Sequence, residues 1–206
     1  MDAAKLLTEL NGFADVYKGL GAEPKFQCLV QSLKEEIALG EQKKVGKVNR
    51  FKAALKFSKL AKKTSEYSRP AIAGAYIGES GKQYIMIAAM AVRYDIPYEG
   101  LVMADDAGTR PNIDKAIDSY DSKLKVELPS IAELKTELKI NKAEGKLNPN
   151  GRSMTKVEEA LYDTEYLITL LETVEPEEAY FSCEGKTPAL TVIGDGAQGL
   201  LLPIRP

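Results

Sequence analysis

Four lysines at helical spacing are the residues of this sequence that most clearly suggest binding chemistry. Lys52, Lys56, Lys59 and Lys63 recur at intervals of four, three and four, so on a helix their ammonium groups lie along one face. No acidic residue lies between them. A row of unneutralised lysines can hold a series of phosphates, a contact that does not depend on base sequence. The other interpretation is an ordinary solvated surface.

The stretch around these lysines concentrates positive charge. Residues 43–69 hold ten of the 28 basic residues and one acid, which gives +9 within a chain of net charge −2. A field of that sign favours an anionic partner. The candidate contacts to DNA are Lys47, Arg50, Lys52, Lys56, Lys59 and Lys63.

Catalytic motifs are weak in this sequence. It contains no histidine, so the usual general base and the histidine ligands of metal sites are missing. Gly194–Gly199 fits the dinucleotide-binding pattern G-x-G-x-x-G, but that pattern needs a helix after its third glycine. Leu200–Ile204 follows instead, and it is apolar and contains a proline. These glycines therefore predict a hairpin turn, and we expect no catalytic residue, no metal ion and no cofactor.

Acidic pairs are the remaining candidates for catalysis. Asp105-Asp106, Glu158-Glu159 and Glu177-Glu178 could bind Mg²⁺ or act as acid and base. Neighbouring side chains point to different sides of a helix or strand, so surface positions explain these pairs better. A small enzyme that uses Asp105 or Asp106 is therefore the least favoured hypothesis for the function of this protein.

The composition is typical of a folded protein. Hydrophobic residues make up 44% and charged residues 28% of the 206 residues, which is enough apolar surface for a core. Cys28 and Cys183 lie in apolar contexts and are expected to be buried, reduced thiols. No signal peptide and no apolar run of membrane-spanning length occurs. We expect a cytoplasmic protein without membrane contact.

Helices are predicted in the first third of the chain. Apolar residues recur at intervals of three and four in residues 3–19, 24–42 and 48–63, which is the helical period. In the third of these helices the lysines occupy one side and apolar residues the other. Residues 1–46 are expected to form an N-terminal helical segment, and residues 47–206 a separate domain.

The later part of the chain is rich in short strands. Three strands are predicted in 70–96, after the lysine-bearing helix, and three more after a helix at 163–174. Pro70 and Pro188 are each expected to open a strand, and Asp195-Gly196 to form a hairpin turn. Weaker signals predict a helix at 131–140 and a strand at 155–161. Both halves thus run helix, strand, strand, strand, which indicates an internal pseudo-repeat and an α+β fold.

These strand-rich blocks resemble the bacterial DNA polymerase III beta subunit, the sliding clamp, and especially its phage-like relatives. In that family a final helix and three strands are followed by an apolar-Pro-apolar-Arg signature. The sequence from Tyr162 onward is similar, and its signature is Leu202-Pro203-Ile204-Arg205. Ser68-Arg69-Pro70 corresponds to the family's [ST]-R-P, and Ala88–Tyr94 to its A-T-D-G-H-R-L. Thr109–Tyr120 is similar to the segment that links clamp domains.

The resemblance implies a clamp-like domain of two pseudo-repeated halves, with the helices turned toward duplex DNA and the sheets facing outward. The lysine-bearing helix is then expected to lie over phosphates. The last strand is expected to line the groove in which clamps bind short peptides of replication proteins. Carried over position by position, this partner-peptide groove comprises Ala89, Ala91, Val92, Arg93, Tyr94, Leu200, Leu202, Pro203, Ile204 and Arg205.

The sequence also departs from the family. A bacterial clamp chain has three such domains and this sequence shows one, so a ring of the same size needs six copies, and homo-oligomer formation stays open. Ala89, Ala91 and Val92 stand where the family's pocket has Thr, Gly and His, which changes the expected ligand preference. The leading hypothesis is a non-catalytic DNA replication accessory (processivity) protein. The alternative is a clamp-fold interaction module or regulator that does not encircle DNA.

Overall fold

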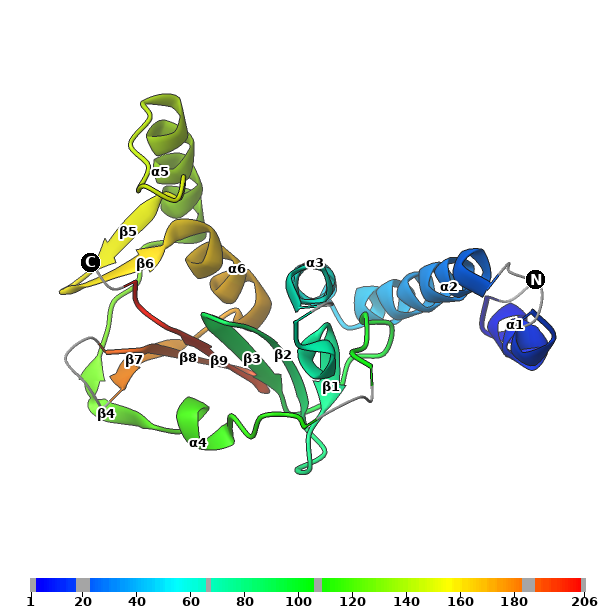
Figure 1. The fold of residues 1–206 in the computed structure, drawn as a ribbon. Helices are drawn as coiled ribbons and strands as arrows, with labels where there is room; N and C mark the ends of the chain where they lie inside the picture. The colour runs from blue at the N-terminus through cyan, green and yellow to red at the C-terminus, as the bar shows by residue number, and fades with distance from the viewer. Residues whose placement is uncertain (1–2, 18–22, 66–67, 106–108, 183–187, 205–206) are drawn as a thin grey trace.

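The computed structural model describes residues 3–17, 23–65, 68–105, 109–182 and 188–204. Three helices come first, and runs of strands separated by helices follow them (Figure 1). In chain order they are α1 (Ala3–Tyr17), α2 (Glu23–Lys44), α3 (Val48–Ser65), the 3₁₀-helix η1 (Pro70–Ile72), β1 (Ala75–Ile77), β2 (Gln83–Ile87), β3 (Met90–Tyr94), α4 (Asp114–Ile117), β4 (Tyr120–Lys125), α5 (Ile131–Ala143), β5 (Met154–Val157), β6 (Ala160–Asp163), α6 (Thr164–Val174), β7 (Glu178–Ser182), β8 (Leu190–Gly194) and β9 (Ala197–Leu201).

An antiparallel sheet forms the centre of the protein. Over the described residues its strand order is β1-β2-β3-β9-β8-β7-β4, while β5 and β6 form a separate hairpin. β3 and β9 pair in the middle of the sheet, with Met90 opposite Leu201 and Tyr94 opposite Ala197. The three strands that follow α3 therefore meet the three strands that follow α6 at this central pairing (Figure 1).

α3 and α6 lie next to each other on one face of the sheet (Figure 1). Because side chains alternate between the two faces of a strand, Val92 and Tyr94 of β3 and Leu201 of β9 all point toward these helices and are buried. A Cβ atom at Gly199 would collide with Leu170 of α6. The glycine thus allows α6 to pack directly on the central strands.

The opposite face of the sheet is crossed by the segment that contains α4 (Figure 1). Arg93 of β3 points to this side and forms salt bridges with Asp114 and Asp118. The hydroxyl of Tyr84 donates a hydrogen bond of 2.6 Å to Asp114. These contacts hold residues 109–119 against the sheet.

α1 and α2 form an arm that projects from the sheet-containing part of the chain (Figure 1). The side chain of Gln31 donates a hydrogen bond of 3.0 Å to the carbonyl of Gly100. Gly100 has φ +80, and a Cβ atom there would lie 2.7 Å from the carbonyl oxygen of Lys34, so glycine allows α2 to approach this turn. The arm confirms the helices predicted for 3–19 and 24–42. No helix in the described ranges has the length and apolar content needed to cross a bilayer.

Several other sequence-based predictions are confirmed. The fold is α+β, and α3 and α6 are present close to the predicted positions. Asp163, the first residue of the predicted helix, caps α6 by accepting hydrogen bonds from the backbone N–H groups of Glu165 and Tyr166, a common role for aspartate at the start of a helix. Gly196 adopts a φ of 65 in the turn between β8 and β9, which a tight hairpin requires.

Other predictions are corrected by the structure. Pro70 opens η1 rather than a strand, because the first helical position also tolerates a residue without an N–H donor. The strand predicted at 155–161 is a hairpin of β5 and β6, with Glu158 at a positive φ of 49 in its turn. Cys28 is exposed rather than buried, because it lies on the projecting arm. Cys183 lies outside the described residues.

Candidate functional site

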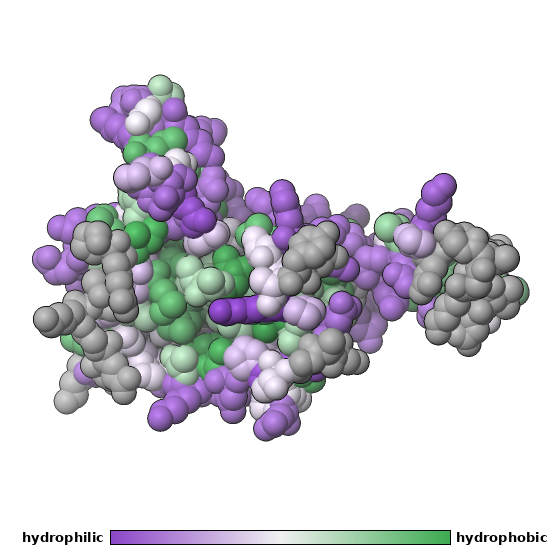
Figure 2. All heavy atoms as spheres, viewed as in Figure 1, coloured by the Kyte–Doolittle hydropathy of each residue, from purple (hydrophilic) through white to green (hydrophobic). Residues whose placement is uncertain are grey.

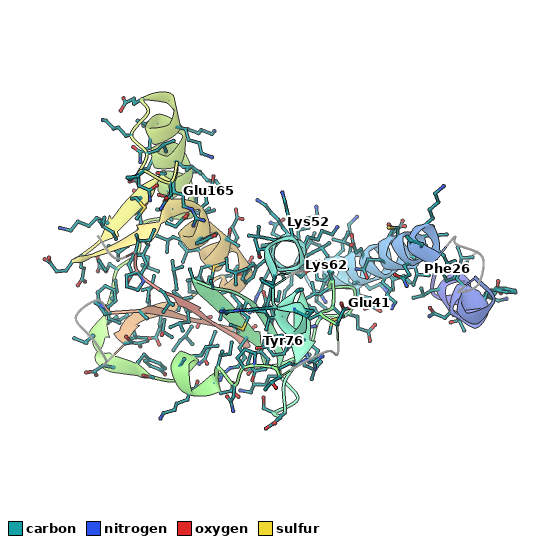
Figure 3. The ribbon with its side chains drawn as sticks, in the orientation of Figure 1. Phe26, Glu41, Lys52, Lys62, Tyr76 and Glu165 are labelled. Carbon is teal, nitrogen blue, oxygen red and sulfur yellow. The ribbon has the colours of Figure 1, made fainter. Side chains whose placement is uncertain are left out.

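The outer face of α3 presents the predicted lysines. α3 buries Phe51, Ala54 and Phe57 against the sheet and α6, so residues on the remaining side of the helix stay in solvent. Lys52, Lys56, Lys59 and Lys63 are all exposed on that side. Figure 3 shows the side chain of Lys52 extending from α3 away from the sheet.

The lysines differ in the charges around them. Lys59 forms a salt bridge of 2.8 Å with Glu35 of α2. Lys52, Lys56 and Lys63 have no salt bridge with any acidic residue in the described parts of the chain. These three side chains therefore keep uncompensated positive charge on the outer face of α3.

Lys47 and Arg50 lie apart from this exposed row. Lys47 forms a salt bridge of 2.7 Å with Asp195 in the β8–β9 turn, and this hydrogen bond and charge lower the pKa of Asp195. Arg50 is buried. It donates hydrogen bonds to the carbonyls of Thr173 and Asp195 at 3.2 and 2.7 Å, and its guanidinium lies 5.8 Å from the ring centroid of Tyr94. Arg50 joins α3 to α6 and to the hairpin turn, where a duplex cannot reach it.

A groove beside this row is shared with α5. A cavity of about 470 Å³ lies between α3, α5 and α6, with Lys52 and Lys56 on its α3 side, Lys135 on its α5 side, and Glu172 and Glu175 at α6. Lys135 also forms a salt bridge of 2.6 Å with Glu172 of α6. Sequence reasoning missed Lys135, although the amphipathic pattern of 131–140 together with its lysines is a usable signal.

The outer face of α6 differs from that of α3. Glu165 and Glu172 occupy it, and each forms a salt bridge of 2.6 Å with a lysine of α5, namely Lys142 and Lys135. α5 thus covers α6 and neutralises its acids. The lysines without an acidic partner in the described ranges therefore lie on the outer face of α3, at Lys52, Lys56 and Lys63.

Part of the predicted peptide groove is assembled at the end of the central strands. The backbone N–H of Leu202 donates a hydrogen bond of 2.8 Å to the carbonyl of Ala89, and that of Ile204 donates one of 2.8 Å to the carbonyl of Leu161. Leu202 and Leu161 are 44% and 39% exposed, and Pro203 lies between the two bonded positions. Figure 2 shows apolar residues gathered in a hollow over the central strands, between α6 and α4. Leu161 was not predicted as part of this surface.

The other predicted groove residues do not join this surface. Val92 and Tyr94 are buried against α3 and α6, because they occupy the core face of β3. Ala91 and Leu200 pair across β3 and β9 on the opposite face. Arg93 is buried on that face, in salt bridges to Asp114 and Asp118. Burial acts to lower the pKa of Arg93, but its hydrogen bonds to both carboxylates raise it overall. Arg205 lies outside the described residues.

The described ranges contain no candidate metal-binding site. There, no group of three His, Cys, Asp or Glu side chains lies close enough to hold a metal ion. Asp105 is exposed, and Asp106 lies outside the described residues. The basic face of α3 and the apolar surface at Ala89 and Leu202 are therefore the best-defined candidate sites. Comparisons with family models, with curated proteins and with solved structures found no match to this chain.

Proposed function

We propose that this protein is a non-catalytic, sliding-clamp-like accessory protein of DNA replication. It binds duplex DNA without sequence preference through the outer face of α3, and it docks partner peptides beside the end of β9. One observation carries the DNA-binding part: Lys52, Lys56 and Lys63 share an exposed face, and no acid in the described ranges pairs with them.

The spacing of these lysines suits a phosphate backbone. From Lys52 to Lys63 the helix rises about 16 Å, a distance over which each strand of a duplex presents about five phosphates. Lys135 lies on the neighbouring wall of the groove, but its ammonium group is paired with Glu172 and adds no free charge to this row. Contacts of this kind position a protein on DNA but read no base sequence.

The order of the strands supports a clamp-like domain. A helix followed by three antiparallel strands occurs twice, as α3-β1-β2-β3 and as α6-β7-β8-β9. In the sheet the two sets run as β1-β2-β3 and β9-β8-β7. Two repeated halves related by a two-fold axis between β3 and β9 would produce this order, and both helices would then lie on the same face, as α3 and α6 do.

The peptide-docking part depends on the apolar surface at the end of the central strands. Backbone hydrogen bonds hold Leu202 beside Ala89 and Ile204 beside Leu161 there. The side chain of Leu202 is 44% exposed. Exposed apolar side chains that gather in one hollow (Figure 2) are typical of sites for other proteins. We assign partner peptides to this surface and not to the buried part of β3.

Salt dependence tests DNA binding directly. Affinity for two duplexes of unrelated sequence is measured over a range of NaCl concentrations. Three lysine–phosphate contacts predict equal affinity for both duplexes and a slope of log K against log salt of about −3. A preference for one sequence, or an affinity that does not change with salt, would contradict the assignment to the α3 face.

A second candidate function is a clamp-fold interaction module that does not encircle DNA. The covered edge of β1 favours it: the N–H of Ala75 bonds to the carbonyl of Val102, and the N–H of Ala104 bonds to the carbonyl of Ala75, both at 2.7 Å. A ring built by pairing sheet edges needs open edges. The molecular mass in solution distinguishes the two, since a ring requires a stable multimer and the module predicts a monomer.

A further inference from the structure

A cavity of about 440 Å³ lies between the end of α3, the β2–β3 turn and the start of α6. Arg69 and Arg152 both line it, together with the hydroxyl-bearing residues Ser65, Ser68 and Tyr166. None of its described lining residues is acidic. The described lining is thus rich in hydrogen-bond donors, and its charged side chains are both basic.

Arg69 has its full hydrogen-bonding capacity available. Its side chain is exposed and makes no hydrogen bond or ion pair with the described residues. Its backbone is fixed, because its N–H donates a bond of 2.8 Å to the carbonyl of Ser65 and Pro70 follows it at the start of η1. A guanidinium at this position offers five N–H donors in a planar fork.

Arg152 is held in place by contacts that leave part of its guanidinium available. One amino group donates a hydrogen bond of 2.9 Å to Asp163, the residue that caps α6, and the guanidinium lies 5.1 Å from the ring centroid of Tyr166. Its side chain is 46% exposed. The remaining donors are therefore oriented before any ligand arrives, which lowers the entropy lost on binding.

We infer that this cavity binds a phosphate monoester. Residues that carry two guanidinium groups and several hydroxyls line the cavity from different elements, and such donors suit a tetrahedral dianion with three acceptor oxygens better than a planar carboxylate with two. The volume lies within the range of small-ligand pockets, which leaves room for the group that carries the phosphate. The bound phosphate group belongs either to a phosphorylated side chain or to a mononucleotide. This site is separate from the lysines of α3 and does not depend on the proposed DNA binding, and it shares Ala89 with the apolar surface at Leu202.

The test follows backbone amide signals of the full chain by NMR while ligand is added at constant ionic strength. Inorganic phosphate, O-phosphoserine and AMP are the three probes. Saturable shifts are expected at Ala88 and Ala89, which line the cavity. Tighter binding of O-phosphoserine assigns a phosphorylated side chain, tighter binding of AMP assigns a nucleotide, and equal binding assigns the phosphate group alone.

Two variants decide whether the arginines are responsible. Arg69→Gln is expected to lower phosphate affinity at least about ten-fold without changing the thermal midpoint, because this side chain has no partner in the described structure. Lys62→Gln is the matched control, since Lys62 is an exposed cation of α3 that does not line the cavity (Figure 3). Unchanged affinity in Arg69→Gln, or an equal loss in the control, overturns the inference.

Discussion

Arg93 and Asp114 form a salt bridge of 2.8 Å on the face of the sheet opposite to α3 and α6. Asp118 forms a second salt bridge of 2.8 Å with the same guanidinium. A buried cation in the central strand β3 is therefore held by two carboxylates from the α4 segment. These partners give Arg93 a structural role and keep it away from the apolar surface at Leu202.

Loss of this buried cation is expected to destabilise the fold. Arg93→Met removes the hydrogen bonds to Asp114 and Asp118, whose side chains are themselves 32% and 53% exposed, so the expected loss is that of hydrogen bonds to a charged group, about 1.5–3 kcal/mol. Urea unfolding measures the change in the free energy of unfolding. Lys115→Met, on the exposed side of α4, is the control and is expected to change it by less than about 0.5 kcal/mol. Similar values for the two variants would contradict the structural role.

Acidification is expected to weaken the same contact. Partial burial acts to raise the pKa of Asp114, but hydrogen bonds from Tyr84 and Arg93 and the charge of Arg93 lower it below its ordinary value of 3.8. A carboxyl group whose pKa is lower in the folded state stabilises the fold above its unfolded pKa, and this contribution is lost as the pH falls through the folded value.

The free energy of unfolding is therefore expected to decrease as the pH falls below about 4, and to decrease less in Asp114→Asn than in the wild type. Urea titrations at a series of pH values measure both slopes. Because other carboxyl groups titrate in the same range, the difference between the two proteins is the relevant quantity. Parallel pH profiles would show that Asp114 does not contribute.

Sequence patterns predicted the local features well. The spacing of the lysines placed Lys52, Lys56 and Lys63 on one exposed face of α3, since helical geometry alone decides this. The same spacing could not reveal that Arg50 lies under the β8–β9 turn, because that turn is distant in sequence. The resemblance placed Val92 and Arg93 together in the peptide groove, although neighbouring residues of a strand point to opposite faces, and only packing decides which face receives the helices.

Arg50 offers a test of this difference between charge pattern and packing. Arg50→Met keeps the volume of the side chain but removes its hydrogen bonds to the carbonyls of Thr173 and Asp195. Hydrogen bonds to a charged group contribute about 1.5–3 kcal/mol, so the free energy of unfolding is expected to fall by about that amount. The DNA affinity of the folded protein is expected to stay the same. A stable variant with weakened DNA binding would place Arg50 at the interface instead.

Gly199 tests the packing of α6 on the central strands. In Gly199→Ala the added methyl group meets the buried side chain of Leu170, and overpacking of a core costs about 1–3 kcal/mol. Gly40→Ala is the matched control, because a Cβ at Gly40 on α2 meets nothing within 4 Å. There the better helix propensity of alanine is expected to raise stability by about 0.5–1 kcal/mol. Thermal or urea unfolding distinguishes these opposite signs, and equal effects would contradict the close approach of α6.

Charge reversal on α3 is the most direct test of the DNA-binding face. In the double variant Lys52→Glu/Lys56→Glu, two phosphate contacts are replaced by repulsion, while the exposed positions carry no packing that the fold needs. The slope of log K against log salt is expected to become less steep by about two, which is about one per lost contact. The affinity for every duplex is expected to fall by a similar factor, because phosphate contacts read no sequence.

Lys115→Glu is the matched control for that experiment. Lys115 is exposed on α4, on the face of the sheet opposite to α3, so its reversal makes the net charge more negative by two units, half the change made by the double variant, without touching the proposed interface. Its affinity and salt slope are expected to remain close to those of the wild type. If Lys115→Glu costs half as much binding free energy as the double variant, which changes the net charge by twice as much, the protein responds only to net charge, and the lysine face of α3 is not the surface that holds DNA.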